Sequence, residues 1–162
     1  MISKVMEFKT ERLILRGIRD VDASKIVEWR SDYNVYRFFK NPHKITIEEH
    51  LSWFNSIYLY DNNRFDFICI EKSSNNKIGV CGMVIKENVA EINYLIAKEA
   101  QHRGYAGEAV KALIDCIRDI CSIDKIIAEI HEDNVSSISL VKKLGFTPLS
   151  VDGSFVKYAI GY

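Results

Sequence analysis

The sequence predicts a mixed α/β (α+β) domain, in which one twisted β-sheet carries helices on both faces. Three observations support this fold class. Segments in which apolar and polar residues alternate, as in strands, are interspersed with segments whose apolar residues recur every three or four positions, as in helices. Strand and helix segments also mix along the chain. No linker or repeat divides the 162 residues, so we expect a single domain over residues 1–162.

The first predicted elements are a strand and two helices. Leu13 and Leu15 fall on one face of the alternating first segment. The first helix has Asp20 and Asp22 as candidate caps. Before the second helix, Thr46 precedes Glu49 by three positions, which is the spacing of a capping box. These elements cover residues 12–18, 19–32 and 46–58.

Three strands, a helix, a strand, a helix and a final strand are predicted for the remainder. The turn at residues 73–76 makes a hairpin of the first two strands. The long helix begins near Ala106, and Gly145 is placed as the left-handed stop of the short helix. The segments cover residues 64–72, 77–86, 87–100, 106–120, 125–131, 136–146 and 153–162.

Charge and composition narrow the functional classes. Lysine and arginine together number 22, as do aspartate and glutamate, so no global field attracts nucleic acid or an acidic membrane. No apolar run reaches the length of a signal peptide or a membrane span. The four cysteines form no CxxC pair, so we expect reduced thiols, no metal and a cytoplasmic location. They are Cys69, Cys81, Cys116 and Cys121.

The stretch QHRGYAGEAV, residues 101–110, places small residues where a helix is about to begin. The unpaired N–H groups of a helix start, together with the helix dipole, favour an anion such as a phosphate. Gly104 and Gly107 would let that anion approach the backbone. An ordinary tight turn is the alternative. Neither a Walker loop nor a Rossmann fingerprint is present.

Three segments resemble the GNAT superfamily of acetyltransferases. Residues 101–106, QHRGYA, are similar to the Q/R-x-x-G-x-G/A motif that binds the pyrophosphate of acetyl-coenzyme A. Residues 134–146, NVSSISLVKKLGF, resemble the superfamily's N-x-x-(A/S)-x-x-L-x-x-K-x-G-F segment. The opening TERLILR, residues 10–16, is similar to the RimJ/RimL-type branch. The resemblance spans almost the whole chain, in the same order.

The resemblance implies a GNAT-like sheet with a splayed central strand pair and acetyl-CoA as co-substrate in the opening. Backbone groups of the strand before the glycine turn would pair with pantetheine, and the turn's amides would hold the pyrophosphate. Asn134 would contact the cofactor arm, although a plain helix N-cap is its alternative. The residues assigned to acetyl-CoA are Leu95, Ile96, Ala97, Gln101, His102, Arg103, Gly104, Tyr105, Ala106, Gly107 and Asn134.

Acetyl transfer to an amine needs a base, because a primary amine with a pKa of ~10 is mostly protonated at neutral pH. Glu129, on the strand that would edge the opening, is the first candidate by resemblance to RimI-type relatives. Glu91 on the neighbouring strand is the second, and His131 is the third. For each, a charged residue on a solvated strand end is the alternative.

The sequence departs from the family where many relatives carry a tyrosine thought to protonate the leaving thiolate. Val141 stands at that position and cannot donate a proton. A thiol pKa near ~8.5 makes the thiolate a good leaving group without help. The hydroxyl of Ser137, or water, could supply the proton instead.

Residues 28–54 resemble the acceptor region of acetyltransferases that act on nucleotide-linked amino sugars. Trp29, Tyr36 and Phe39 could stack on a base, and Arg30 and Arg37 could bind a diphosphate. The alternative is that the aromatic residues are core residues and the arginines are solvated.

The acceptor class and the number of subunits are left open by the sequence. The expected partner is a small-molecule amine or a protein N-terminus, with a polyamine or antibiotic amine as rivals. A non-catalytic acyl-CoA-binding module and a homodimer are also compatible with the residues.

Overall fold

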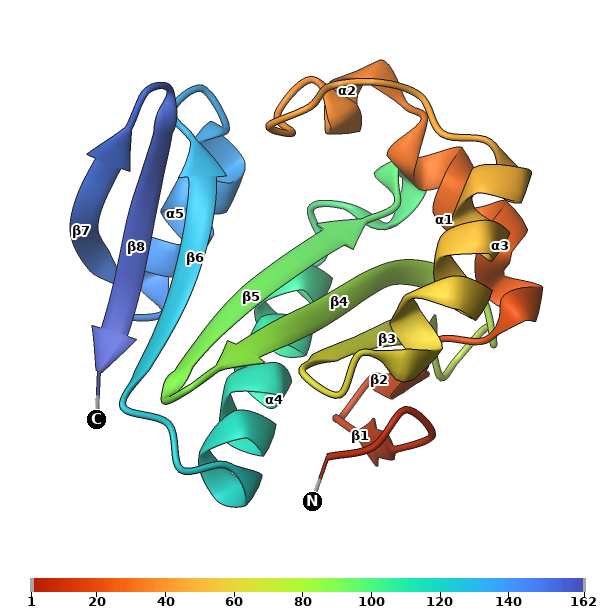
Figure 1. Ribbon diagram of the computed structural model, residues 1–162, viewed down its shortest axis with the longest axis horizontal. Coiled ribbons are helices and arrows are strands. Elements are labelled where there is room, and N and C mark those ends of the chain that lie inside the picture. The colour runs from red at the N-terminus through yellow and green to blue at the C-terminus, as the bar shows by residue number, and fades with distance from the viewer. Residues whose placement is uncertain (1, 162) are drawn as a thin grey trace.

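The computed structural model describes residues 2–161 and confirms the predicted fold class, one mixed sheet with helices on both faces (Figure 1). The strands are β1 (Glu7–Lys9), β2 (Leu13–Gly17), β3 (Arg64–Glu71), β4 (Lys77–Lys86), β5 (Val89–Ile96), β6 (Lys125–His131), β7 (Thr147–Asp152) and β8 (Phe155–Gly161). The α-helices are α1 (Ala23–Arg30), α2 (Tyr33–Tyr36), α3 (Ile47–Ser56), α4 (Tyr105–Ile120) and α5 (Val135–Lys143). Short 3-10 helices cover η1 (Asp20–Asp22), η2 (Tyr58–Tyr60) and η3 (Lys98–Ala100).

The sheet opens in its middle. Its strand order is β1-β2-β3-β4-β5-β6-β8-β7, and of these neighbours β5 and β6 run parallel while the others are antiparallel. Within residues 2–161, β5 and β6 pair only from Val89–Lys125 to Glu91–Ile127. Beyond these pairs the two strands separate, as Figure 1 shows. The predicted splayed strand pair is therefore confirmed.

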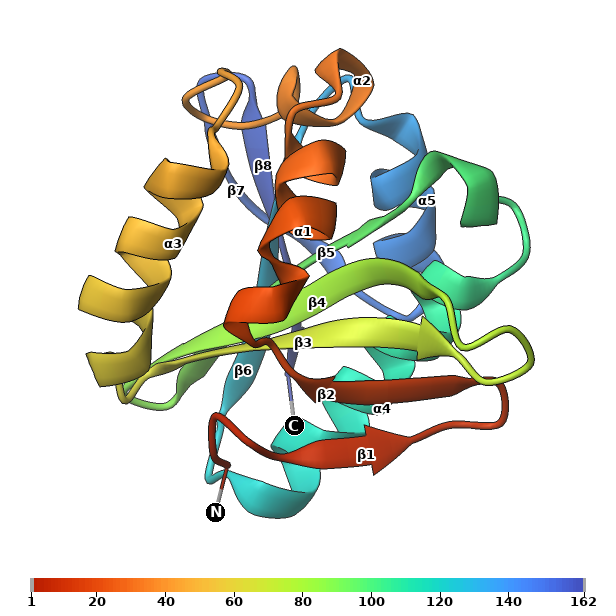
Figure 2. The same cartoon turned by 90° about the vertical axis from the view of Figure 1, so that its right-hand side faces the viewer.

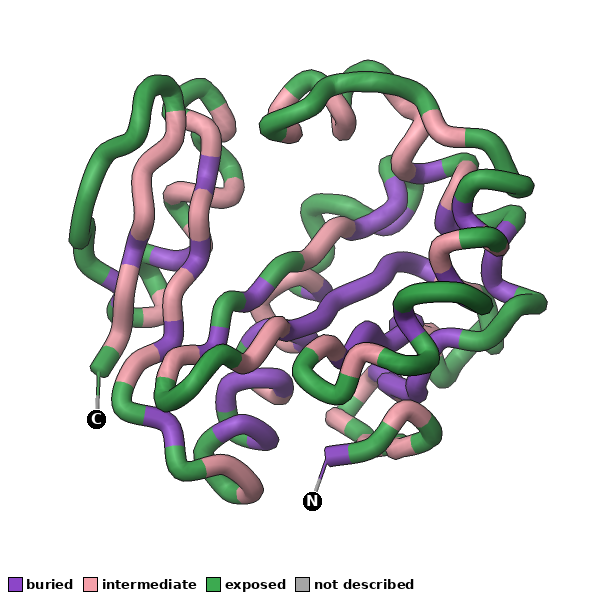
Figure 3. The backbone as a smooth tube through the Cα atoms, viewed as in Figure 1, coloured by how far each residue is buried: buried purple, intermediate pink, exposed green. Residues whose placement is uncertain are grey.

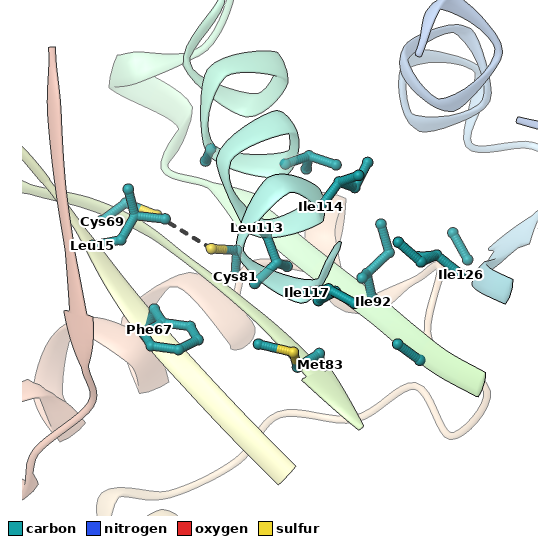
Figure 4. Packing of buried hydrophobic residues seen from close by; sticks show 14 of the residues in the cluster. Leu15, Phe67, Cys69, Cys81, Met83, Ile92, Leu113, Ile114, Ile117 and Ile126 are labelled. Carbon is teal, nitrogen blue, oxygen red and sulfur yellow. Dashed lines mark hydrogen bonds between the residues drawn. The ribbon is translucent and has the colours of Figure 1, made fainter. Parts of the chain in front are cut away.

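The larger hydrophobic core lies between the sheet and α4. Figure 3 colours much of β4 and parts of α4 as buried. Leu113 and Ile117 of α4 are fully buried against Phe67 and Met83 of the sheet (Figure 4). Burial of their side chains removes apolar surface from water, and each large side chain contributes about 1.5–3 kcal/mol. All four cysteines are free thiols, three of them buried, and the Cys69 and Cys81 sulfurs are 3.9 Å apart.

A second, smaller core lies on the opposite face. There α1 and α3 cover β3 and β4, with α4 behind the sheet (Figure 2). Trp29 of α1 and Phe54 of α3 pack with Ile68 and Val80 of the sheet. This second core holds α1 and α3, which belong to the segment with the predicted acceptor residues, against the sheet.

Of the residues predicted to begin or end helices, two are confirmed, and the predicted side-chain cap by Asp22 is wrong. Thr46 and Glu49 form the expected capping box at α3, with Glu49 N–H donating to Thr46 Oγ1 at 3.1 Å. Gly145 adopts the left-handed conformation after α5, with φ of +97°. Asp22 is the N-cap residue of α1, but its side chain makes no cap hydrogen bond there. Instead, its carboxylate forms ion pairs with the side chains of Arg16 and Lys77.

Several elements were not predicted. The strand β1 is only three residues long, and β7 is an exposed edge strand that contains Pro148. Short edge strands and strands with proline give weak alternation signals. The single turn of α2 was also missed, and α4 begins at Tyr105, one residue earlier than expected.

Candidate active site

Glu91 on β5 and Glu129 on β6, the first two candidates for the base, lie on the same face of the sheet beside the opening. Ala90 and Ile92 of β5 point into the α4 core, as do the alternate residues Ile126, Ala128 and Ile130 of β6. Since side chains alternate along a strand, Glu91 and Glu129 point to the opposite face, on which α1 and α3 pack.

The free backbone along β5 is shorter than predicted. The Ala97 N–H donates to the Ile78 carbonyl at 2.8 Å, and the Ala97 carbonyl accepts from the Ala100 N–H at 2.9 Å. The Ala97 N–H is therefore already used within the chain, and only its carbonyl could accept a further hydrogen bond from pantetheine. The Ile96 carbonyl also accepts a hydrogen bond, from the Gln101 side chain at 3.0 Å. Leu95 keeps its predicted place on the part of β5 beyond its pairing with β6.

The turn before α4 has left-handed backbone conformations and no side-chain cap. Gly104 is the N-cap residue, has φ of +82°, and makes no side-chain cap to the first amides of α4. His102 also has a positive φ, of +63°. A Cβ at Gly107 would meet the Leu140 side chain at 3.4 Å, so α5 packs closely beside the turn. Uncapped helix amides fit the diphosphate of coenzyme A.

Arg12, the residue directly before β2, binds to this turn and to α4. Its Nε binds Glu108 Oε1 of α4 at 2.8 Å, and its Nη1 donates to the Arg103 carbonyl at 2.9 Å. The guanidinium also lies over the Tyr105 ring at 4.3 Å. These bonds fix the backbone that would face the diphosphate. Arg12 was missed because its partners lie about 90 residues away in the sequence.

Replacing Gly104 with alanine should weaken coenzyme A binding. Alanine strains the backbone at φ +82°, and its Cβ would lie 3.4 Å from Arg12 Nη2. Non-glycine residues held in the left-handed region cost of order 1–3 kcal/mol, so we expect a Kd about tenfold higher by calorimetry. Gly153→Ala is the matched control, because Gly153 has φ of +58° in open space on the β7–β8 turn. Equal Kd changes in both variants would contradict a role of the turn in binding.

Glu129 is a nearly buried carboxylate on this face, on the strand that borders the opening. Its side chain is only 6% exposed and binds the Lys40 ammonium, with Lys157 Nζ 3.9 Å from its other oxygen. Glu91, the second candidate, is exposed. His131, the third, is held between Phe38 and Phe155 with ring centroids 5.7 and 5.2 Å away.

The segment after α2 reaches across the opening toward β6 and β8 (Figure 1). Phe38 contacts His131 on β6, and Lys40 Nζ lies 5.6 Å from the Phe155 ring centroid on β8. This segment, residues 37–41, is called the crossing loop below. Sequence reasoning missed Lys40 because only the folded loop brings it to Glu129.

At the start of α5, Asn134 serves as the helix N-cap. Its Oδ1 accepts from the Ser137 N–H at 3.4 Å. The Ser137 carbonyl in turn accepts from the Tyr94 hydroxyl at 3.3 Å, so Tyr94 reaches from β5 to α5. Val141 is fully buried in the α4 core. Tyr94 was not predicted, because the alternation of β5 indicates only its face.

The predicted acceptor residues do not form one surface. Trp29 is 5% exposed within the second core, so the prediction that it stacks on a ligand base is corrected. Tyr36 packs edge-on against Tyr33. Arg37 is exposed and lies over Phe38 on the crossing loop. The guanidinium of Arg30 is 5.4 Å from the Phe39 ring, and burial lowers its pKa.

A buried polar group lies beneath α1 and α3. Asp66 of β3 is 4% exposed and accepts from Arg64 Nε at 2.8 Å, and burial raises its pKa. His50 of α3 is 3% exposed, and neither ring nitrogen has a hydrogen-bond partner among residues 2–161. Burial lowers the pKa of His50, which favours its neutral form.

Metal-ligand clusters and membrane-spanning helices are absent from the described residues. Within residues 2–161, no three histidine, cysteine, aspartate or glutamate side chains lie together as metal ligands would. No helix in this part of the chain combines the length and apolar character needed to span a membrane.

A splayed parallel strand pair, a helix start without a side-chain cap and a nearly buried carboxylate lie around one opening of the sheet. The model of the Acetyltransferase (GNAT) domain matches residues 12–147. The chain therefore belongs to the GNAT acetyltransferase family and is an N-acetyltransferase.

Similar proteins agree with this family. Uncharacterized N-acetyltransferase p20 of Bacillus licheniformis is 31% identical over 144 residues, which cover 85% of this chain and 80% of that protein. A domain from Methanocaldococcus jannaschii superposes with a TM-score of 0.83 at 27% identity, covering 93% and 99% of the two chains. Spermidine N-acetyltransferase from Vibrio cholerae, in complex with CoA and spermine, gives 0.84 at 21% identity, with 94% and 96% covered, and shares the fold.

Proposed function

We propose that the protein transfers the acetyl group of acetyl-CoA to a primary amine by direct attack, with Glu129 as the general base. The observation that carries this proposal is the position of Glu129. It is a nearly buried carboxylate, on the strand that borders the opening, and it already binds a primary ammonium, that of Lys40. A group that binds an ammonium can also receive its proton when the amine attacks.

Residues of the turn and of β5 would hold acetyl-CoA. The amides from Arg103 to Gly107 would bind the diphosphate, aided by Gln101, and Leu95 on β5 and Asn134 on α5 would border its pantetheine arm. The co-substrate supplies an activated thioester. Four free thiols, three of them buried, support a cytoplasmic location.

Two hydroxyl groups near α5 are candidates for protonating the thiolate. Val141 is fully buried and carries no proton to give. Ser137 lies at the start of α5, and the Tyr94 hydroxyl reaches its carbonyl from β5. Burial raises the pKa of Tyr94, so the phenol is protonated near neutral pH, although the raised pKa makes it a weaker acid.

The acceptor would enter on the α1–α3 face, beneath the crossing loop. An amine attached to a phosphate-bearing group, such as a nucleotide-linked amino sugar, is our first candidate because Arg37 is exposed on that loop. A base would have to stack on Tyr36 or Phe39, since Trp29 is buried. A protein N-terminus is the alternative acceptor. Because the buried Val141 has no proton to donate, the rival function is a non-catalytic acyl-CoA-binding module.

An acceptor screen tests the proposal. The protein is incubated with acetyl-CoA and a panel of nucleotide-linked amino sugars, peptide N-termini, polyamines and aminoglycosides, and free thiol release is followed together with product mass. We expect thiol release that depends on one class of amine. Tight acetyl-CoA binding by calorimetry without any amine-dependent thiol release would contradict the proposal and identify a binding module.

A further inference from the structure

The contact between Lys40 and Glu129 places an amine of the chain itself at the proposed base. Lys40 lies on the crossing loop, which belongs to no helix or strand, and its side chain is 61% exposed. Its ammonium nevertheless binds the 6%-exposed Glu129 carboxylate. Resting on the proposed function, we propose that Lys40 is a self-acetylation site, modified in cis by the acetyl group of acetyl-CoA when no acceptor is bound.

Contacts of Phe38 and Lys40 hold the crossing loop against β6 and β8. Phe38 packs on His131, and Phe155 lies close to both His131 and the Lys40 ammonium. Three aromatic rings thus hold the loop on β6 and β8. The Lys40 side chain reaches Glu129 from this docked loop, from the face on which an acceptor amine would approach.

The charges around Lys40 favour an amine at this point. Glu129 on β6 contacts it, and Glu91 on β5 and Asp152 on β7 add attraction from either side, while Lys157 on β8 lies on the other oxygen of Glu129. The hydrogen bond to Glu129 raises the pKa of Lys40, so the resting amine is protonated. The same carboxylate that holds this proton would have to receive it for Lys40 to react.

The reaction balances with groups already named. Glu129 takes a proton from the Lys40 ammonium, and the neutral Nζ attacks the thioester carbonyl. The C–N bond forms as the C–S bond breaks, and coenzyme A leaves as a thiolate. The nitrogen then loses its second proton, and the thiolate takes up a proton, so the products are the neutral amide and the free thiol. The acetylated side chain is neutral, so its ion pair with Glu129 is lost. An added acceptor amine would compete with Lys40 for Glu129.

The test incubates the full chain with acetyl-CoA and no other amine, and follows acetylation by peptide mass spectrometry. Lys44 is the internal control, because it is an exposed lysine four residues further along that forms no ion pair with Glu129. A general base contributes ~10²–10⁴ in rate, so we expect Lys40 to be acetylated at least about tenfold faster than Lys44. The rate per molecule should not depend on protein concentration.

Two variants distinguish acetylation assisted by Glu129 from the unassisted reaction of an exposed lysine. Glu129→Gln should slow Lys40 acetylation to the rate of Lys44, and coenzyme A binding by calorimetry checks that this variant is folded. Lys40→Arg keeps a cation for Glu129 but should yield no modified peptide. Equal acetylation of Lys40 and Lys44 in the unaltered protein, or a rate that rises with protein concentration, would overturn the inference.

Parallel thiol-release assays distinguish failure of the inference from failure of the proposed function. If an amine of the screen is acetylated while Lys40 reacts no faster than Lys44, the self-acetylation site is wrong and the proposed function stands. If coenzyme A binds and neither amine nor Lys40 is acetylated, both are wrong.

Discussion

Glu129→Gln should lower turnover by about 10²–10⁴, the usual contribution of a general base. Glutamine keeps the shape of the side chain on β6 but cannot receive the proton of the attacking amine. The loss should be largest at low pH, where nearly all acceptor amine is protonated. It should shrink as the pH approaches the pKa of ~10 of a primary amine. The measurement is kcat against pH, with the amine found in the screen.

Two other glutamates provide the controls. Glu91→Gln removes the second candidate base, which is exposed on β5, and should reduce turnover far less. Glu132→Gln removes an exposed carboxylate just after β6 and should leave turnover unchanged. A pH profile of Glu129→Gln that parallels the unaltered enzyme over the whole range would exclude Glu129 from the chemistry. A larger effect of Glu91→Gln would assign the base to β5.

Local patterns predicted the parts of the fold that depend on neighbouring residues. The capping box of Thr46 and Glu49 and the stop at Gly145 were found because each needs only four or five consecutive residues. The inner strands were also predicted, because at least one face of each packs on a core and its residues are therefore apolar. β1 and β7 have no such contrast, since β1 has three residues and every residue of β7 is exposed.

The candidate site was predicted less completely, because its contacts are distant in sequence. The glycine turn and Asn134 are local motifs and were found. The bond of Lys40 to Glu129 joins residues 89 positions apart, and that of Arg12 to Glu108 joins residues 96 apart. Trp29 was misassigned for a related reason. The spacing of apolar residues indicates which side of a helix is apolar. Only the packing of α1 on the sheet shows that the Trp29 ring is buried.

Asp22→Ala should cost about 3–5 kcal/mol of unfolding free energy, because it leaves the buried guanidinium of Arg16 without its partner. The Asp22 carboxylate is fully buried and accepts from Arg16 Nη1 and Nη2 at 2.8 and 2.9 Å. Lys77 Nζ lies 2.7 Å away, and the Arg19 N–H donates at 2.8 Å. This cluster ties β2 and β4 to the start of α1. The measurement is urea denaturation at neutral pH.

The loss of stability in Asp22→Ala should depend on pH, and the pKa of Asp22 sets the direction of that dependence. Burial alone would raise the pKa of Asp22, but hydrogen bonds from Arg16, Lys77 and the Arg19 N–H outweigh it and lower the pKa to about 2. Its stabilisation is therefore complete above the ordinary carboxyl pKa of about 3.9 and is lost as the pH falls toward 2. The difference between Asp22→Ala and the unaltered protein should narrow over that interval. Asp20→Ala is the matched control, since Asp20 is exposed in the same 3-10 helix and should change stability by less than about 0.5 kcal/mol. Equal losses for the two aspartates would show that the buried carboxylate does not hold β2, β4 and α1 together.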